Sequence, residues 1–228
     1  MLLAHATWPQ LPVAPTVLVP VGSTEQHGPH LPFDTDSIIA TAVSSGVAEA
    51  LGAIVAPTIT YGASGEHQDF PGTASIGSEA LRLLILELVR SISTWAGRIV
   101  LVNAHGGNVG TLGSVVPQLI AERHKVAWVT CTAQGGDAHA GRTETSMLLH
   151  LSPNIVRVDL AMRGNTAPIG ELIGELSRSG VRSVSPTGVL GDPSGATAVE
   201  GEAQLELLVA NISELILVGA VDKRGCLR

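Results

Sequence analysis

The chain has 228 residues, a length that suits one large α/β domain. Hydrophobic residues make up 45% of the sequence and charged residues 14%, so there is ample material for a core and too little charge for a disordered chain. The formal net charge is −7 and no basic cluster occurs. This argues against nucleic acid as a partner, because phosphate binding needs concentrated Lys and Arg.

The cysteines and the apolar segments indicate neither export nor a membrane. Cys131 and Cys226 are too few for a disulfide scaffold and lack zinc-finger spacing. The segment 1–15 has no basic region and no long apolar run, so we expect no signal peptide. The apolar stretch 205–221 is interrupted by polar residues and is too polar to span a bilayer. We therefore expect a cytoplasmic protein with no membrane partner.

Short β-branched runs alternate with longer helical patterns. The runs expected to form strands are 16–21, 54–60, 98–103 and 126–132. The segments expected to form the helices after them are 37–51, 78–95, 110–124 and 143–151. Ser78 is the expected N-cap of the second helix. The alternation is typical of βαβ units, and nearly continuous apolar strands fit a sheet covered on both faces.

The C-terminal third is less regular. Helices are expected at 172–179 and 203–219, with a Gly/Pro-rich loop at 184–196 between them. No linker and no repeat divides the chain. The sequence therefore predicts an α/β fold in which residues 1–228 form a single domain, a three-layer sandwich with a mostly parallel central sheet.

Polar segments rich in His and carboxylates follow all four expected strands, at 22–36, 61–67, 103–108 and 135–144. In an open parallel sheet the carboxyl ends of the strands meet at one edge, where ligand sites form. We therefore expect these segments to build an active site. Five of the eight histidines lie in them: His27, His30, His67, His105 and His139. The other three, which we assign to surface or structural roles, are His5, His124 and His150.

Imidazoles and carboxylates are the available donors, and they suit Zn²⁺, Mn²⁺ or Fe²⁺ in a catalytic site. Glu25 and His27 are two residues apart in an extended segment, so both side chains are expected to point the same way. Asp36, at the start of the next helix, can fold back towards them and bridge two metals. Each residue alone has an ordinary explanation, such as turn capping by Glu25 or helix capping by Asp36. Their joint position at consecutive strand ends favours a metal site.

These same segments resemble the creatininase (creatinine amidohydrolase) family. The resemblance covers 17–197 and lies in the stretches LVPVGSTEQHGPHLPFDTD, YGASGEHQDFPGT, VNAHGGN, DAHAGRTETS and GDPSGAT. It implies a parallel-sheet α/β fold, hydrolysis of a C–N amide bond and two divalent metal ions per chain, zinc with iron or manganese. It also implies a homo-oligomer, for which the loop 185–196 is a natural contact element.

The resemblance assigns roles to particular residues. The implied metal ligands are Glu25, His27, Asp36 as the bridge, His105 and Glu144. His139 matches the position that handles protons, and we expect it to deliver a proton to the leaving nitrogen. Asp34 and Asn103 are candidates for orienting the ligands. A loop expected to contact substrate carries Ser64 and His67, with Glu66 between them.

The substrate is less closely defined. Where this chain has His105-Gly106-Gly107, the resemblance implies a His-Tyr-Glu pattern for creatinine hydrolases. We therefore expect open space beside His105, which suits a peptide better than a small ring. The sequence is most similar to family members of mycofactocin biosynthesis, peptidases that release a C-terminal Val-Tyr dipeptide from a modified precursor peptide. Two alternatives stay open: a small-molecule amidohydrolase acting on creatinine or a formamide, and a non-catalytic metal-binding assembly protein. The intact ligand set disfavours the second alternative.

Overall fold

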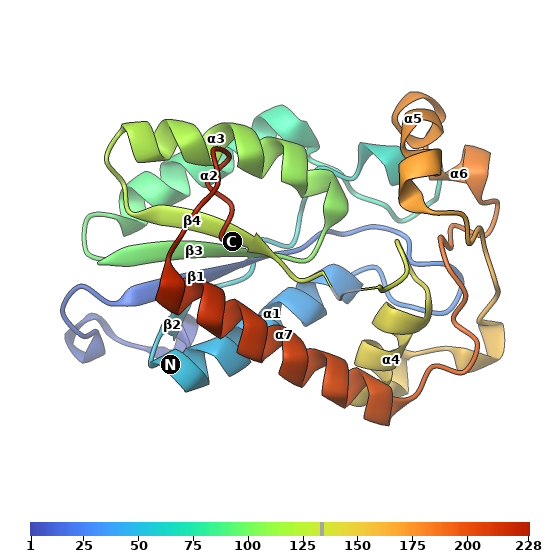
Figure 1. The fold of residues 1–228 in the computed structure, drawn as a ribbon, viewed down its shortest axis with the longest axis horizontal. Coiled ribbons are helices and arrows are strands. Elements are labelled where there is room, and N and C mark those ends of the chain that lie inside the picture. Colours follow the sequence, from blue (N-terminus) through green and yellow to red (C-terminus); the bar gives the residue numbers. More distant parts are fainter. Residues whose placement is uncertain (133–134) are drawn as a thin grey trace.

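A parallel sheet forms the centre of the molecule. The computed structural model describes residues 1–132 and 135–228, and within them four strands pair in the order β2-β1-β3-β4 (Figure 1). The strands are β1 (Thr16–Val21), β2 (Ile54–Val55), β3 (Arg98–Asn103) and β4 (Val126–Thr130). β1 and β3 are in register over their whole length, from Thr16 opposite Arg98 to Val21 opposite Asn103. The parallel sheet that the sequence predicts is therefore confirmed.

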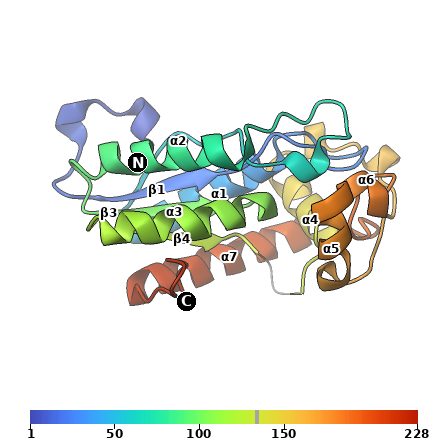
Figure 2. The ribbon, with the colours of Figure 1, turned by 90° about the horizontal axis from the view of Figure 1, so that it is seen from above.

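Helices cover both faces of this sheet. On one face lie α2 (Gly77–Ile92) and α3 (Val109–Ala121), and on the other lie α1 (Thr35–Leu51), α4 (Arg142–Leu151) and α7 (Ala198–Val218) (Figures 1 and 2). None of the described helices is long and apolar enough to cross a membrane.

Two apolar cores fill the space between the layers. Val17 and Val19 of β1 point to one face and pack in the core with α2 and α3, whereas Leu18 points to the other and packs in the core with α1 and α7. Because the strands are covered on both sides, their central residues form apolar runs instead of alternating with polar ones. The three-layer arrangement agrees with the prediction.

A smaller helical unit lies beside the carboxyl ends of the strands. It consists of α5 (Ile169–Ser179) and α6 (Val181–Val184), whose buried side chains pack against Leu190 and Phe70 (Figure 1). Short 3₁₀ helices occupy several connections: Leu3–His5, Trp8–Gln10, Gly65–His67, Gly106–Asn108, Pro153–Ile155 and Val158–Leu160.

The second strand is shorter than predicted. Its ladder ends at Val55, and Pro57, which has no N–H to donate, lies in the predicted continuation. The chain rejoins the sheet once, at Ile59, whose N–H donates to the carbonyl oxygen of Pro20 at 3.0 Å.

Two helix starts also differ from the predictions. Ser78 is not an N-cap: α2 begins one residue earlier, and the N–H of Gly77 donates to the hydroxyl of Ser75 at 3.2 Å. The last helix begins five residues before the predicted start, because the Thr197 side chain accepts a hydrogen bond from the N–H of Glu200. A threonine three residues before a glutamate is a capping signal that marks this start in the sequence.

The two ends of the chain lie along the edges of the sheet. At the β2 edge, the N–H of Val55 donates to the carbonyl oxygen of Met1 at 2.9 Å. At the β4 edge, the N–H of Trp128 donates to the carbonyl oxygen of Gly225 at 3.1 Å, and the N–H of Leu227 donates to that of Trp128 at 2.9 Å. Each edge strand therefore has a partner on its outer side.

Candidate active site

The polar loops converge at the carboxyl ends of the strands, as predicted. All five histidines of these loops are buried, whereas His5 and His150 are exposed and His124 is half-buried. The parallel sheet brings the loops together because all its strands end at the same edge.

Asp36 lies at the centre of this cluster. Its Oδ1 is 3.2 Å from Nε2 of His27, and its Oδ2 is 3.4 Å from Nδ1 of His105. The hydroxyl of Ser23 donates to Oδ2 at 2.7 Å and fixes the carboxylate. Asp36 is in the first turn of α1, which starts directly after the β1 loop and aims this side chain back at it. A carboxylate between two imidazoles from different loops has the arrangement of a bridging metal ligand.

Two groups of possible metal ligands share Asp36. One consists of Glu25, Asp36 and His105, and the other of His27, Asp36 and Glu144; the donor atoms of each group lie within 4.8 Å of one another. The structure therefore brings all five sequence-predicted ligands together.

The environment of Glu25 fits a bound cation. The side chain is fully buried, and neither carboxylate oxygen accepts a hydrogen bond, although Nε2 of His105 lies 3.2 Å and Nε2 of His67 lies 3.3 Å away. In the part of the chain that the structure describes, no Lys or Arg pairs with Glu25, Asp36 or Glu144. Burying such carboxylates is costly unless positive charge compensates them, and a divalent ion supplies that charge.

The carboxylates also control the charge of the nearby imidazoles in the metal-free protein. Burial lowers the pKa of His27, but Asp36 outweighs it and raises that pKa to about 10. Burial likewise opposes protonation of His105, but Glu25 and Asp36 raise its pKa to about 10. Burial raises the pKa of Glu144 to about 7. Without metal, His27 and His105 therefore carry the positive charge at neutral pH.

Gln26 positions two further histidines, a role that the sequence analysis missed. Its side-chain amide donates to Nδ1 of His67 at 2.8 Å and to the carbonyl oxygen of Gly188 at 3.0 Å. Its backbone carbonyl oxygen lies 2.8 Å from Nε2 of His139. Because a carbonyl only accepts, we assign the proton of His139 to Nε2. The available signal is position: Gln26 lies between two predicted metal ligands, Glu25 and His27.

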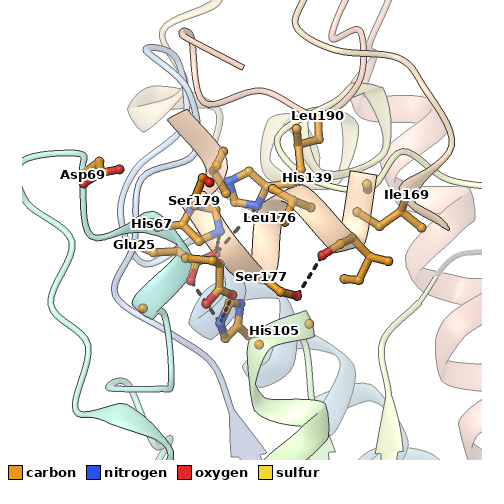
Figure 3. A pocket seen from close by; sticks show the side chains of 18 of the residues that line it. Glu25, His67, Asp69, His105, His139, Ile169, Leu176, Ser177, Ser179 and Leu190 are labelled. Atoms are coloured by element: carbon orange, nitrogen blue, oxygen red, sulfur yellow. Dashed lines mark hydrogen bonds and ion pairs between the residues drawn. The ribbon is translucent and has the colours of Figure 1, made fainter. Parts of the chain in front are cut away.

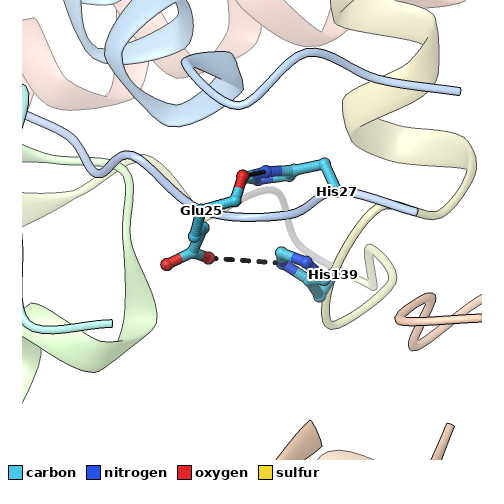
Figure 4. A group of neighbouring side chains, drawn as sticks. All are labelled: Glu25, His27 and His139. Carbon is cyan, nitrogen blue, oxygen red and sulfur yellow. Dashed lines mark hydrogen bonds and ion pairs between the residues drawn. The ribbon is translucent and has the colours of Figure 1, made fainter. Parts of the chain in front are cut away.

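His139 lies at the edge of both ligand groups. Its Nδ1 is 3.7 Å from Oε1 of Glu25, and its ring centroid is 4.3 Å from that of His27 (Figure 4). Burial, together with the positive charge of His27, lowers the pKa of His139 well below its usual value. The ring is therefore neutral, and Nδ1 carries a lone pair directed at the site. Donor atoms of His139, Glu25 and His27 also lie within 4.8 Å of one another.

Of the other residues that the sequence assigns to the site, Ser64 and Asn103 lie in it and Asp34 does not. The hydroxyl of Ser64 is buried and lies 3.3 Å from Nε2 of His105. The side-chain amide of Asn103 donates to the backbone carbonyl of His105 at 2.7 Å, so it orients that loop. Asp34 is exposed, and the structure gives its side chain no hydrogen bond within the described residues. The prediction that Asp34 orients a ligand is therefore wrong, because its side chain faces solvent just before α1.

The Gly/Pro-rich loop packs against the site. The N–H of His139 donates to the carbonyl oxygen of Leu190 at 3.1 Å, and the N–H of Leu190 donates back at 2.9 Å. Val189 and Leu190 are buried. This part of the loop therefore holds the His139 segment in place within its own chain.

A cavity of about 710 Å³ opens beside the ligand group of Glu25 and His105 (Figure 3). Its polar lining includes Glu25, His67, His105 and His139, and its apolar lining includes Ile169, Ile173 and Leu176 of α5, together with Leu190. The chemistry-bearing side chains are thus accessible to a ligand that also contacts an apolar surface.

The two glycines after His105 are not equivalent. A Cβ on Gly106 would meet no atom within 4 Å, which confirms the open space expected there. A Cβ on Gly107 would overlap the carboxylate of Glu66, the imidazole of His105 and the carbonyl oxygen of Ala63. The expectation of open space at Gly107 is therefore wrong, because Glu66 from another loop fills it.

Comparison with known sequences places this site in context. The family model for creatininase, described as creatinine amidohydrolase, matches residues 4–216. A mycofactocin precursor peptide peptidase from Mycobacterium ulcerans (strain Agy99) is 56% identical over 209 residues, which cover 87% of this chain and 84% of that protein. The corresponding peptidase from Mycolicibacterium smegmatis is 52% identical over 221 residues, covering 94% and 90%.

Solved structures show the same fold. A manganese form of creatininase superposes with a TM-score of 0.75 at 26% identity, covering 94% of this chain and 96% of that one. A mutant creatininase described as Zn-Zn type gives a TM-score of 0.76 at 25% identity with the same coverage.

Proposed function

The chain belongs to the creatininase family, and we propose that it is a dinuclear metal-dependent peptidase that hydrolyses an amide bond near the C-terminus of a modified peptide. The observation that carries the proposal is the pair of ligand groups that share Asp36, one of which contributes Glu25 and His105 to the lining of a cavity of about 710 Å³. Relatives that are 52% and 56% identical carry the name mycofactocin precursor peptide peptidase. We infer that the product is the C-terminal Val-Tyr dipeptide of that precursor.

The donor set supports two divalent ions. Glu25, Asp36 and His105 would hold one ion, and His27, Asp36 and Glu144 would hold the other. Such a pair, when bound, lowers the pKa of a coordinated water and polarises the scissile carbonyl. Mixed imidazole and carboxylate donors accept several first-row metals, and creatininase structures exist in manganese and zinc forms. We propose zinc together with iron or manganese.

The tautomer of His139 defines its part in the reaction. Since Nε2–H is held by the Gln26 carbonyl, the lone pair on Nδ1 is free to accept a proton from the attacking water. As the C–O bond forms and the C–N bond breaks, the same nitrogen delivers that proton to the leaving amine. His67, held by Gln26, faces the Glu25 carboxylate and keeps it oriented.

A peptide uses the cavity better than a small ring does. A volume of about 710 Å³ is in the range that encloses drug-sized ligands. Ile169 and Ile173 are exposed on α5 and provide apolar contact away from the reacting bond. Binding energy gained there positions the scissile amide over the ligand groups. The second candidate, a small-molecule amidohydrolase, is supported by a creatinine amidohydrolase from Pseudomonas putida that is 27% identical over 88% of this chain.

The test is an assay of the metal-loaded protein with a decarboxylated mycofactocin-type precursor peptide, followed by mass spectrometry. We expect release of the Val-Tyr dipeptide and no comparable turnover of creatinine or of a formamide. Addition of a chelator should stop the release, and added metal should restore it. Rapid creatinine or formamide hydrolysis with an intact peptide would replace this proposal by the second candidate.

We also propose a cytoplasmic homo-oligomer. The outer side of α7 exposes Leu207, Leu217 and Val218, which is apolar surface that a second copy could cover. Sedimentation of the purified protein, compared with a variant carrying Leu207→Lys and Leu217→Lys, tests this assembly.

A further inference from the structure

Glu66 lies beside the ligand group formed by Glu25 and His105. Its Oε1 is 3.5 Å from Nε2 of His105, the same nitrogen that lies 3.2 Å from Oε2 of Glu25. Donor atoms of Glu66, Glu25 and His67 lie within 4.8 Å of one another. Glu66 also lines the cavity, so this third carboxylate reaches the group from the open side.

The loop that carries Glu66 is fixed to the loop that carries His105. The N–H of Ala63 donates to the side-chain oxygen of Asn108 at 2.9 Å, and the N–H of Ser64 donates to the hydroxyl of Ser75 at 2.9 Å. Asn108 also donates to the carbonyl oxygen of Gly22, on the β1 loop. The approach of Glu66 to His105 is therefore held by hydrogen bonds among three of the site loops.

Gly107 makes this approach possible. Any Cβ at this position would overlap both the Glu66 carboxylate and the His105 imidazole. The neighbouring Glu25 carboxylate is fully buried, and its close partners are the imidazoles of His67 and His105, at 3.3 and 3.2 Å. Two carboxylates this close repel each other, and once metal binding has made His105 neutral, the divalent ion would be the charge that offsets this repulsion.

We propose that Glu66 is a further carboxylate ligand of the metal ion that Glu25 and His105 hold, supplied by the loop after β2 into the space left by Gly107. This inference rests on the proposed function, because it assumes that this ion is bound. It assigns to Glu66 a role in holding the metal, and to Gly107 the role of admitting that carboxylate.

The test compares metal binding by the full chain with that of two variants. Glu66→Gln keeps the size of the side chain and removes its charge. Asp69→Asn is the matched control, since Asp69 lies three residues further on, is exposed and lines the same cavity. Chelator-treated proteins are titrated with Co²⁺ and followed by visible absorption and by metal analysis after dialysis. The melting temperatures of the metal-free proteins report whether each variant folds.

We expect two Co²⁺ per chain in the wild type and in Asp69→Asn. In Glu66→Gln, one ion should bind about 10–100-fold more weakly, the loss typical when a group supporting a metal is removed. Its visible absorption should also change as the ion loses a ligand. Glu66→Asp, which keeps the carboxylate on a shorter chain, should give intermediate affinity and serves if the Gln variant does not fold.

Two results would contradict the proposal in different ways. If the wild type binds two ions and Glu66→Gln matches it in affinity and spectrum, the assignment of Glu66 is wrong and the proposed function stands. If the wild type binds no metal, the proposed function fails and the assignment of Glu66 fails with it.

Discussion

The backbone carbonyl oxygen of Gln26 lies 2.8 Å from Nε2 of His139 and fixes the tautomer of that imidazole. A main-chain acceptor holds the ring whatever side chain stands at position 26. The proposed base is thus oriented by the same segment that supplies Glu25 and His27.

Replacing this base should separate turnover from metal binding. We expect His139→Ala to retain its metal and to lose roughly 10²–10⁴-fold in turnover, the contribution typical of a positioned acid–base group. Metal analysis and dipeptide release measure the two effects. His150→Ala, an exposed histidine on α4, is the matched control and should behave like the wild type. Unchanged turnover in His139→Ala would remove this residue from the mechanism.

The Asp36→Ala variant should lose both metal binding and turnover. Its two oxygens face His27 and His105, so its removal takes one ligand from each group. We expect fewer than two ions per chain by metal analysis and no measurable dipeptide release. Ser23→Ala, which removes only the hydrogen bond to Asp36, should keep both ions at reduced affinity. Two tightly bound ions in Asp36→Ala would show that this carboxylate is not the bridge.

The raised pKa values of His27 and His105 predict how pH affects the metal-free protein. Both groups have a folded-state pKa of about 10, against an ordinary value of 6.5, so the folded state binds more protons between these values. The contribution of these two groups to the free energy of unfolding should therefore be greatest below pH 6.5. It should fall as the pH rises towards 10. Urea unfolding of the chelator-treated protein at pH 7 and pH 9 checks this.

Bound metal should reverse the dependence of the free energy of unfolding on pH. Ligation requires neutral imidazoles, so metal binding at pH 7 should release protons, and affinity should rise with pH. Calorimetric titration in buffers of different ionisation enthalpy counts the released protons. A metal-free protein whose stability rises between pH 7 and pH 9 would contradict the charge assignment of these two histidines.

Adjacent glycines provide a matched pair of variants. Gly107→Ala places a Cβ against Glu66 and His105, whereas Gly106→Ala meets nothing within 4 Å. We expect weaker metal binding in Gly107→Ala and wild-type binding in Gly106→Ala, measured by Co²⁺ titration. Melting of the metal-free variants shows whether the fold is intact. Equal affinities in the two variants would show that the space at Gly107 does not matter to the site.

The sequence could predict the residues at the strand ends but not all of their contacts. Glu25, His27 and Asp36 follow one strand, and a parallel sheet dictates that their loop meets those carrying His105 and Glu144. The contact between Glu66 and Gly107 depends on tertiary structure: β2 and β3 lie on either side of β1, so their loops meet over its end. Strand order is not written in periodicity, and this contact was therefore missed.

The predicted ends of β2 and α7 differ from the observed ends because single residues decide where an element stops or starts. The run 54–60 is rich in β-branched residues, yet the β2 ladder stops at Val55, ahead of Pro57. Apolar spacing predicts a start of α7 at residue 203, five residues after its true start at Ala198. The hydrogen bond between Thr197 and Glu200, which starts the helix, involves residues that spacing alone ignores.

The pairing of both chain ends with the outer strands has a consequence for handling the protein. An uncovered edge strand offers a row of free N–H and C=O groups to which another chain can add. Deleting residues 1–2 would uncover Val55, and deleting 225–228 would uncover Trp128. Trimming either end would therefore leave an edge strand without its outer partner, as a template for aggregation.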